Sequence, residues 1–243
     1  MGIDITGLDA VFFSQQFCET KKNMLMIGRQ GIHLYGKHIL DTISRKYNIH
    51  CPDYVFTTWA EPLFNFLGHT SVDSLDYSGF EGANIIHNMN KPITSDILLN
   101  NEPILNKYNY ILDCGTTEHI FNCPQVCENI INLLDVGGIY LSVIPNNNLS
   151  GHGIYQFSPE FFMTAYSEKY GMKVLELYIA EVNAEKDRWI QCNSYTGWRN
   201  MAKFNNTNEV YIIAIVKKIS NTRESLIDNP PNQYSYEKDW LSF

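Results

Sequence analysis

The stretch from residue 108 to residue 160 constrains the fold more than any other part of the chain. Two short apolar runs, 110–112 and 139–144, enclose residues 125–134, whose apolar side chains have the three- and four-residue spacing of an amphipathic helix. The Gly137-Gly138 pair marks the end of that helix. Two buried strands around one helix form a βαβ unit, so we expect parallel strands joined by a right-handed crossover.

A polar cluster follows each of these two strands. Residues 113–119 come after the first strand, and residues 145–156 come after the second. The carboxyl ends of parallel strands meet at one edge of a sheet, and α/β proteins bind their ligands there. We therefore expect the functional site at this edge.

The composition indicates one globular α/β domain that spans residues 1–243. The net charge is −8 and no basic stripe is present, which argues against a nucleic-acid partner. No apolar run approaches the roughly 18 residues that span a bilayer, so no membrane partner is expected. The six cysteines form no CxxC pair, and the start of the chain lacks the apolar core of a signal peptide. These features favour a reduced, cytoplasmic protein, and they leave its oligomeric state open.

The other elements are predicted from the same signals. Helices are expected between the first five of seven strands, including one over 34–47, and the last two strands should form an antiparallel hairpin at the sheet edge. A further helix should begin at Ser158, as N-cap before Pro159, and run to about Tyr170. The expected strands cover residues 24–28, 71–76, 83–88, 108–114, 139–144, 173–182 and 209–217.

Two segments do not fit this alternation. Residues 51–67 are rich in aromatic side chains and contain two prolines, which indicates neither a simple helix nor a simple strand. They are expected to cover the core or to close over a pocket as a lid. Residues 220–243 contain Asn229-Pro-Pro and many polar side chains, and they are expected to form a surface tail.

This order of elements resembles the class I S-adenosylmethionine-dependent methyltransferase fold, a Rossmann-like α/β fold with a mostly parallel seven-stranded sheet and helices on both faces. The resemblance covers roughly residues 20–218, and it is carried by residues 112–122 (LDCGTTEHIFN) and 133–140 (LLDVGGIY). The segment 151–160 (GHGIYQFSPE) is similar to methyltransferases of bacterial capsular and surface-polysaccharide biosynthesis.

The resemblance implies S-adenosylmethionine as the cofactor and assigns residues to it. The glycine-rich loop would be Gly28, Arg29 and Gln30, although it has only two glycines and lacks the usual preceding acidic residue. The acidic residue that binds the ribose would be Asp76, followed by Tyr77, and Asn88 stands where the family has its third acidic position. The cofactor's amino-acid end would lie near Asp113, Cys114 and Gly115.

Three side chains are candidates for catalysis. Methyl transfer to a hydroxyl requires removal of a proton, and histidine suits this role near neutral pH. His152 and His119 are the candidate bases, and Glu118 could orient a base or accept a proton itself. Each histidine could instead bond to the backbone and hold its loop in shape.

Polar side chains after the fifth strand indicate the acceptor. Asn147, Tyr155 and Gln156 are expected to bind a small-molecule or carbohydrate acceptor, for which a nucleotide-linked or surface-glycan sugar is the first hypothesis from the resemblance. Alternatively, Tyr155 and Gln156 pack or bond beneath the following helix.

Two other functional classes remain open. A methyltransferase-like binding protein without catalysis would explain the degenerate glycine loop. A nicotinamide-dependent dehydrogenase is disfavoured because no GxGxxG follows the first strand. No metal site is predicted, since His33, His38, His50 and Cys51 lack a second pair that would complete a tetrahedral set.

Overall fold

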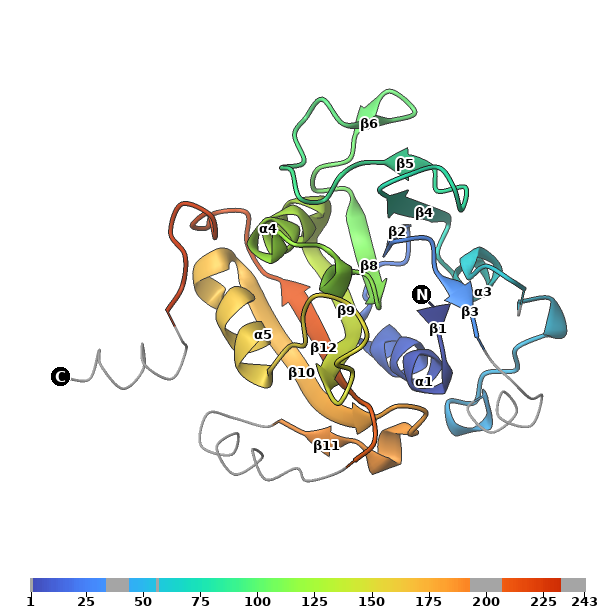
Figure 1. Cartoon of the computed structure of the whole chain (residues 1–243). Helices are drawn as coiled ribbons and strands as arrows, with labels where there is room; N and C mark the ends of the chain where they lie inside the picture. The colour runs from blue at the N-terminus through green and yellow to red at the C-terminus, as the bar shows by residue number, and fades with distance from the viewer. Residues whose placement is uncertain (1, 34–43, 56, 193–206, 233–243) are drawn as a thin grey trace.

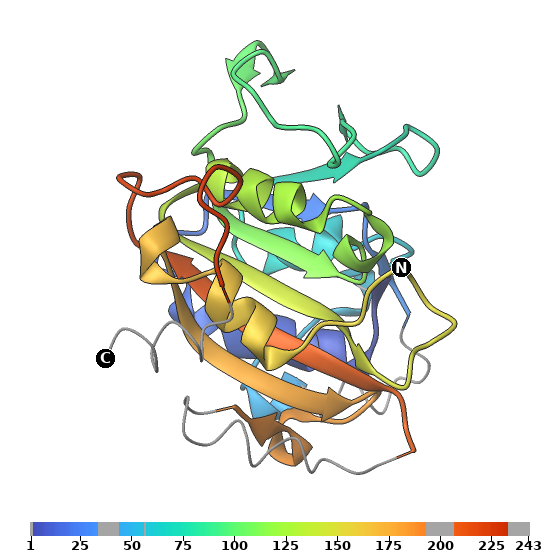
Figure 2. The same ribbon diagram turned by 60° about the vertical axis from the view of Figure 1, so that its left-hand side comes forward.

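The apolar residues of the central strands alternate between two hydrophobic cores. The structure is a computed structural model that describes residues 2–33, 44–55, 57–192 and 207–232. In β2 (Asn23–Ile27), Leu25 and Ile27 belong to one core, whereas Met24 and Met26 belong to the other. Because successive strand side chains point to opposite faces, both faces of the sheet need a cover. Helices α4 (Cys123–Leu133) and α5 (Pro159–Ala165) cover one face, and α1 (Ile5–Ser14) and α3 (Glu61–Phe66) cover the other (Figures 1 and 2).

The main sheet has eight described strands rather than the seven predicted. Its order is β11 (Ile190–Gln191), β10 (Met172–Glu181), β12 (Val210–Lys218), β9 (Leu134–Asn147), β8 (Tyr108–Cys114), β2, β4 (Ser71–Asp76) and β5 (Ile85–Ile86). The five strands from β9 to β5 are parallel. Strand β12 pairs with both β9 and β10, antiparallel to each, and therefore lies between them. The predicted antiparallel pair, β10 and β12, is not at the edge of the sheet, because the short β11 pairs with the outer side of β10 (Figure 2).

The βαβ unit predicted from residues 108–144 is present. Strands β8 and β9 are parallel neighbours, and α4 (Cys123–Leu133) connects them. The predicted cap at Ser158 is confirmed, since its side chain accepts a hydrogen bond from the Phe161 amide at the start of α5 (Pro159–Ala165). The helix stops at Ala165, earlier than predicted, and a 3₁₀ turn, η4 (Glu168–Tyr170), follows it.

The prediction of helices between all of the first five strands is wrong. Residues 77–107 contain no helix, and they form turns, β5 and the small hairpin β6 (Leu98–Leu99) and β7 (Glu102–Pro103). Asn100, Asn101 and Asn106 adopt positive φ there, a conformation that asparagine tolerates and that a helix excludes. The helix predicted over 34–47 lies largely outside the described residues.

The aromatic segment 51–67 packs into the core. It contains η2 (Asp53–Val55) and α3 (Glu61–Phe66), and Leu63 and Phe64 are fully buried beside α1 (Ile5–Ser14). Trp59 forms an isolated bridge with Gly31 of β3 (Gly31–Ile32), which is paired in turn with β1 (Gly2–Ile3). The segment therefore supports the chain that follows β2.

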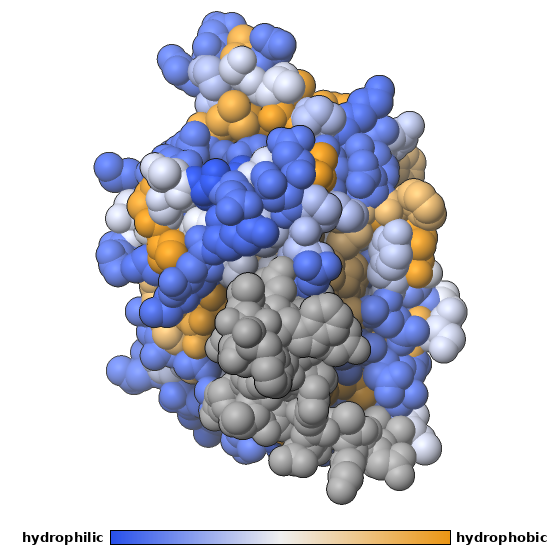
Figure 3. Space-filling view, turned by 90° about the vertical axis from the view of Figure 1, so that its left-hand side faces the viewer, coloured by the Kyte–Doolittle hydropathy of each residue, from blue (hydrophilic) through white to orange (hydrophobic). Residues whose placement is uncertain are grey.

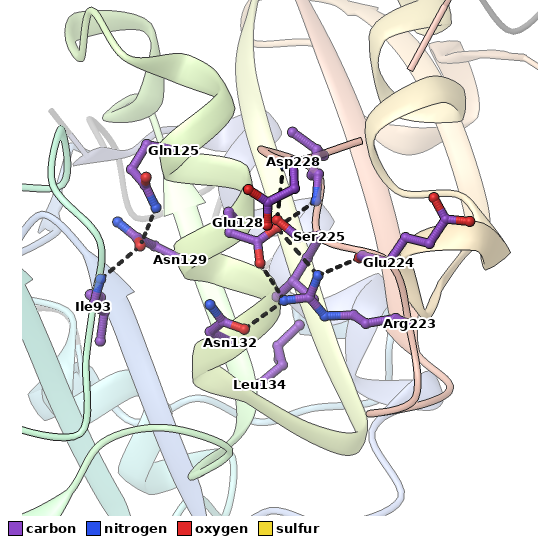
Figure 4. A network of polar contacts seen from close by, with 12 residues as sticks. Ile93, Gln125, Glu128, Asn129, Asn132, Leu134, Arg223, Glu224, Ser225 and Asp228 are labelled. Atoms are coloured by element: carbon purple, nitrogen blue, oxygen red, sulfur yellow. Dashed lines mark hydrogen bonds and ion pairs between the residues drawn. The ribbon is translucent and has the colours of Figure 1, made fainter. Parts of the chain in front are cut away.

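Helix α4 is fixed by polar contacts on two sides (Figure 4). On one side, the Asn129 side chain donates to the carbonyls of Met89 and Lys91, at 3.2 and 2.9 Å, and accepts from the Ile93 amide at 2.9 Å. On the other side, the Arg223 guanidinium binds the Glu128 carboxylate at 2.6 Å. The first contact fixes the chain after β5, and the second fixes the C-terminal segment.

The described part of the C-terminal segment docks on the body of the protein. Leu226 is buried in the core that α4 covers, and its amide donates to Glu128 at 2.9 Å. The face shown in Figure 3 is mainly hydrophilic, with hydrophobic residues in several separate patches. Among the described residues, no helix combines the length and hydrophobicity required to cross a bilayer.

One buried histidine lacks hydrogen bonds from its ring. His69 is 2% exposed, and neither ring nitrogen has a hydrogen-bond partner among the described residues. It packs against the rings of Phe64 and Tyr110, with centroids 5.9 and 5.2 Å away. Burial, aided by the charge of Lys21, lowers the pKa of His69 to about 4.

This environment predicts a pH-dependent stability. Between the unfolded pKa of about 6.5 and the folded pKa, the unfolded chain binds a proton that the folded chain does not. The contribution of neutral His69 is therefore complete above the unfolded pKa and is lost as the pH falls toward the folded pKa. The unfolding free energy of wild type should therefore fall as the pH is lowered from about 7.5 to about 4.5. In His69→Phe, which has no titratable ring, this fall should be smaller by on the order of 2–3 kcal/mol. Urea unfolding of both proteins at the two pH values measures this, and equal losses would contradict the assignment.

Candidate functional site

Strand register brings the predicted polar residues to one edge of the sheet. Ile27, the last residue of β2, pairs with Leu75 of β4 on one side and with Asp113 of β8 on the other. The residues that follow these positions, Gly28, Asp76 and the turn after Cys114, therefore leave the sheet together. The site lies at the carboxyl edge, as predicted from the parallel strands.

A cavity of about 230 Å³ opens at this edge. Five of its lining residues were predicted as site residues: Gly28, Asp76, Tyr77, Asn88 and His119. The other lining residues were not among the predicted site residues, although Met89 and Asn90 adjoin Asn88 in the segment 88–90 where the family's third acidic position was expected; they are Ile27, Leu75, His87, Met89, Asn90, Thr116 and Ile120. Thr116 lies inside the predicted 113–119 cluster, and Asn90 belongs to the Asn-Met-Asn sequence after β5. Both could therefore have been predicted as site residues from their position in a polar segment after a strand.

Only glycine fits at the start of the loop after β2. Gly28 has φ of 72°, and its amide donates to the Leu75 carbonyl at 2.7 Å. A Cβ at this position would lie 2.6 Å from the Thr116 hydroxyl, which itself donates to the Ile27 carbonyl at 2.5 Å. The left-handed backbone and the close approach of Thr116 both favour glycine at this position.

The opposite wall is held by asparagine contacts. The Asn88 side-chain oxygen accepts from the backbone and side-chain amides of Asn90, at 3.0 and 2.9 Å. The Asn90 side chain accepts from the Asn122 amide at 2.9 Å, just before α4. Together with Asn129 beneath, these contacts fix the wall that faces Asp76.

Arg29 and Gln30 do not line the cavity, although both were predicted to bind the cofactor. The Arg29 guanidinium binds Glu61 at 2.7 Å and lies over the Trp59 ring, 4.5 Å from its centroid. Gln30 is fully buried and donates to the Ile27 carbonyl at 2.8 Å and to Thr116 at 3.2 Å. Their polar groups are engaged in shaping the loop.

Asp113, Cys114 and Gly115 likewise stand behind the cavity. Asp113 is fully buried, and its carboxylate accepts from the Thr116 amide at 2.9 Å and from the Thr117 hydroxyl. Burial raises the pKa of Asp113 against the effect of these hydrogen bonds. Cys114 is 5% exposed and faces the Gly2 carbonyl. These residues build the turn that presents Thr116 and His119.

The three predicted catalytic side chains converge beside the cavity. One Glu118 carboxylate oxygen lies 3.7 Å from Nε2 of His119 and 3.4 Å from Nε2 of His152. The two imidazole rings meet edge to face, with centroids 4.9 Å apart. Burial, together with the charge of Asp113, raises the pKa of Glu118 to about 8. Burial and the neighbouring His152 lower the pKa of His119.

A short loop places His152 in this cluster. The Glu118 carbonyl accepts hydrogen bonds from the amides of Ile154 and Tyr155, at 2.7 and 3.2 Å. Gly153 has φ of 76°, and a Cβ there would lie 2.8 Å from Cγ of Glu118. The loop therefore reaches Glu118 only because residue 153 has no side chain.

Two of the predicted acceptor residues also shape this loop. The Tyr155 hydroxyl donates to the Phe121 carbonyl at 2.7 Å, and the Gln156 side chain accepts from the Leu149 amide at 3.0 Å. Both side chains thus bond to the backbone of neighbouring segments, a structural role that was considered beside acceptor binding. Asn147 is exposed at the end of β9, opposite Val210.

The fold has recognisable neighbours among solved structures, whereas no family model and no curated protein matches the sequence. A candidate methyltransferase of Haloferax volcanii, solved with the Trm112 activator, is 11% identical with a TM-score of 0.48, and the match covers 87% of this chain and 90% of that one. A candidate methyltransferase of Bacillus halodurans is 12% identical (TM-score 0.42; 88% and 100% covered). A SAM-dependent methyltransferase of Archaeoglobus fulgidus is also 12% identical (TM-score 0.41; 86% and 93% covered). Likenesses of this size assign no function.

The two glycines around His152 give a matched test of the loop. Gly153→Ala places a side chain against Glu118 in a left-handed backbone, and it should lower the unfolding free energy by about 1–2 kcal/mol or more. Gly151 has no atom within 4 Å of its Cβ position, so Gly151→Ala should change stability by no more than about 0.5 kcal/mol. Urea unfolding measures both, and equal effects would show that the loop does not dock as described.

Proposed function

We propose that this protein is an S-adenosylmethionine-dependent methyltransferase. The main support is the cavity at the carboxyl ends of β2, β4 and β5, which is lined by Gly28, Asp76 and His119 among others. Asp76 is suited to accept hydrogen bonds from ribose hydroxyls, and the bare backbone at Gly28 leaves room for the amino-acid end of the cofactor. The side-chain nitrogen of Asn88, whose oxygen is bonded to Asn90, would donate to an adenine.

The reaction would be transfer of the methyl group to a hydroxyl oxygen of the acceptor. The oxygen attacks the methyl carbon, the carbon–sulfur bond breaks, and its electron pair stays on sulfur, which leaves S-adenosylhomocysteine. The hydroxyl proton goes to a base, for which His152 and His119 are placed beside the cavity with Glu118 behind them. Most of the rate enhancement would come from alignment of the two substrates and the remainder from the base.

We further propose that the acceptor is a sugar or nucleotide-linked sugar of surface-polysaccharide (capsule) biosynthesis, methylated by a single-domain enzyme in the cytoplasm. The support is the similarity of residues 151–160 to methyltransferases of that class, together with the exposure of Asn147 and of His152, which belongs to the cluster. A polyol presents several hydroxyls to such a surface, and one of them would have to reach the cavity.

Calorimetric titration tests the cofactor assignment. Wild-type protein should bind S-adenosylmethionine and S-adenosylhomocysteine, and Asp76→Ala should weaken both by about 10- to 150-fold, the cost of losing hydrogen bonds to a charged group. Asp96→Ala, which removes an exposed carboxylate that does not line the cavity, is the matched control and should bind like wild type.

Two results would overturn the assignment. Binding that Asp76→Ala leaves unchanged would place the nucleoside elsewhere, and no binding by wild type would remove the methyltransferase proposal altogether. A parallel titration with NAD distinguishes the dehydrogenase alternative, which predicts that NAD binds in place of S-adenosylmethionine.

A further inference from the structure

Glu118, His119 and His152 form a set of metal-ligand donors. Each offers one ligand atom, and these atoms all lie within 4.8 Å of one another. The carboxylate oxygen of Glu118 is 3.4 and 3.7 Å from the two imidazole nitrogens. Ligands of a four-coordinate ion bound at about 2.0–2.1 Å lie about 3.4 Å apart. Small side-chain rotations would therefore bring all three atoms onto one ion.

The carboxylate of Glu118 points independently to a missing ligand. The side chain is fully buried, and neither carboxylate oxygen has a hydrogen-bond partner among the described residues. A buried carboxylate without a partner is costly, and buried acidic groups are normally hydrogen-bonded, paired or bound to metal. A cation held between Glu118 and the two imidazoles would supply that partner.

The backbone is built to keep the three donors together. Glu118 and His119 lie in η3 (Thr117–His119), whereas His152 comes from the loop after β9. The Glu118 carbonyl binds the two amides that follow Gly153, so the same residue that offers the carboxylate also anchors the histidine loop. Both histidines are partly exposed, with 38% and 47% of the side chain accessible, which leaves an approach from solvent.

We propose that Glu118, His119 and His152 bind a divalent transition-metal ion, with Zn²⁺ as the reference case. Two imidazoles and one carboxylate suit zinc and its neighbours, and three protein ligands with an open position are the pattern of catalytic rather than structural sites. Mg²⁺ and Ca²⁺ prefer sites built from oxygen ligands. The same three residues were predicted from the sequence as catalytic groups but not as metal ligands, because residues 118 and 119 are far from residue 152 in the chain and show no ligand spacing.

The position of the ion suggests a role in activating the acceptor, and this role rests on the proposed function. His119 lines the cavity, so an ion held by this histidine would lie at the edge of the cavity. A hydroxyl bound there would be held beside the methyl donor, and it would release its proton more readily than a free hydroxyl. In that case the histidines serve as ligands, and the metal rather than an imidazole activates the acceptor.

Metal binding can be tested without any cofactor. Chelator-treated wild-type protein is titrated with Zn²⁺ by calorimetry and with Co²⁺ by visible absorption, which reports the coordination of the ion. We expect one site per chain, weakened by about 100-fold or more in His152→Ala and in Glu118→Gln, since loss of even an outer-shell partner costs about 10- to 100-fold. His50→Ala is the matched control: it removes an exposed histidine beside Cys51 and should bind both ions like wild type. Urea unfolding confirms that each variant is folded.

The outcomes separate this inference from the proposed function. Wild-type protein that binds S-adenosylmethionine but neither ion would overturn the metal site and leave the methyltransferase proposal standing. Wild-type protein that binds the ions but not S-adenosylmethionine would overturn the methyltransferase proposal and leave the metal site standing. Affinity that survives His152→Ala and Glu118→Gln but falls in His50→Ala would place the ion at the His50–Cys51 surface and overturn the assignment.

Discussion

The register of β2 is the constraint on which the site depends. Ile27 of β2 lies opposite Leu75 of β4 and Asp113 of β8. The segments that follow these three strands therefore leave the sheet side by side at the same edge. A shift of one residue would exchange the two faces of β2 and bury the wrong side chains in each core. The hydrophobic alternation of β2 thus places Gly28, and the pairing of β4 with β5 places Asp76 beside the wall formed by Asn88 and Asn90.

A second contact couples the two polar clusters. They are separated in sequence by α4 and β9, and they meet where the Glu118 carbonyl binds the amides of Ile154 and Tyr155. The absence of a side chain at Gly153 permits this approach. Within the resulting cluster, His119 lines the cavity, whereas His152 is partly exposed to solvent. The cavity and the Glu118–His119–His152 cluster are therefore adjacent and share His119.

Much of the fold could be predicted because its signals are local. The apolar spacing of α4, the runs that become β8 and β9, and the Ser158 cap each depend on neighbours in sequence. The insertion of β12 between β9 and β10 could not be predicted, since it depends on which strands pair. No helix forms between β5 and β8 because Asn100, Asn101 and Asn106 adopt positive φ in turns, and because the start of this segment is held by long-range contacts of Met89, Lys91 and Ile93 with Asn129 of α4.

The candidate site was predictable in outline and not in detail. Gly28, Asp76 and Asn88 were assigned from the family resemblance and His119 from its chemistry, and all four line the cavity. Asp113, Arg29 and Gln30 were assigned from the same resemblance and do not line the cavity, and their side chains bond to neighbouring segments. The convergence of Glu118 with His152 is a tertiary contact that no local spacing reveals. Burial of the Glu118 carboxylate, likewise, is visible only once the two loops are docked.

The most direct test of this account is a crystal structure of the protein with S-adenosylhomocysteine. The account predicts that the nucleoside occupies the cavity after β2, with its ribose hydroxyls on Asp76 and its sulfur directed toward His119. A nucleoside bound at any other surface, or bound in the cavity with the sulfur turned away from the Glu118–His119–His152 cluster, would contradict it.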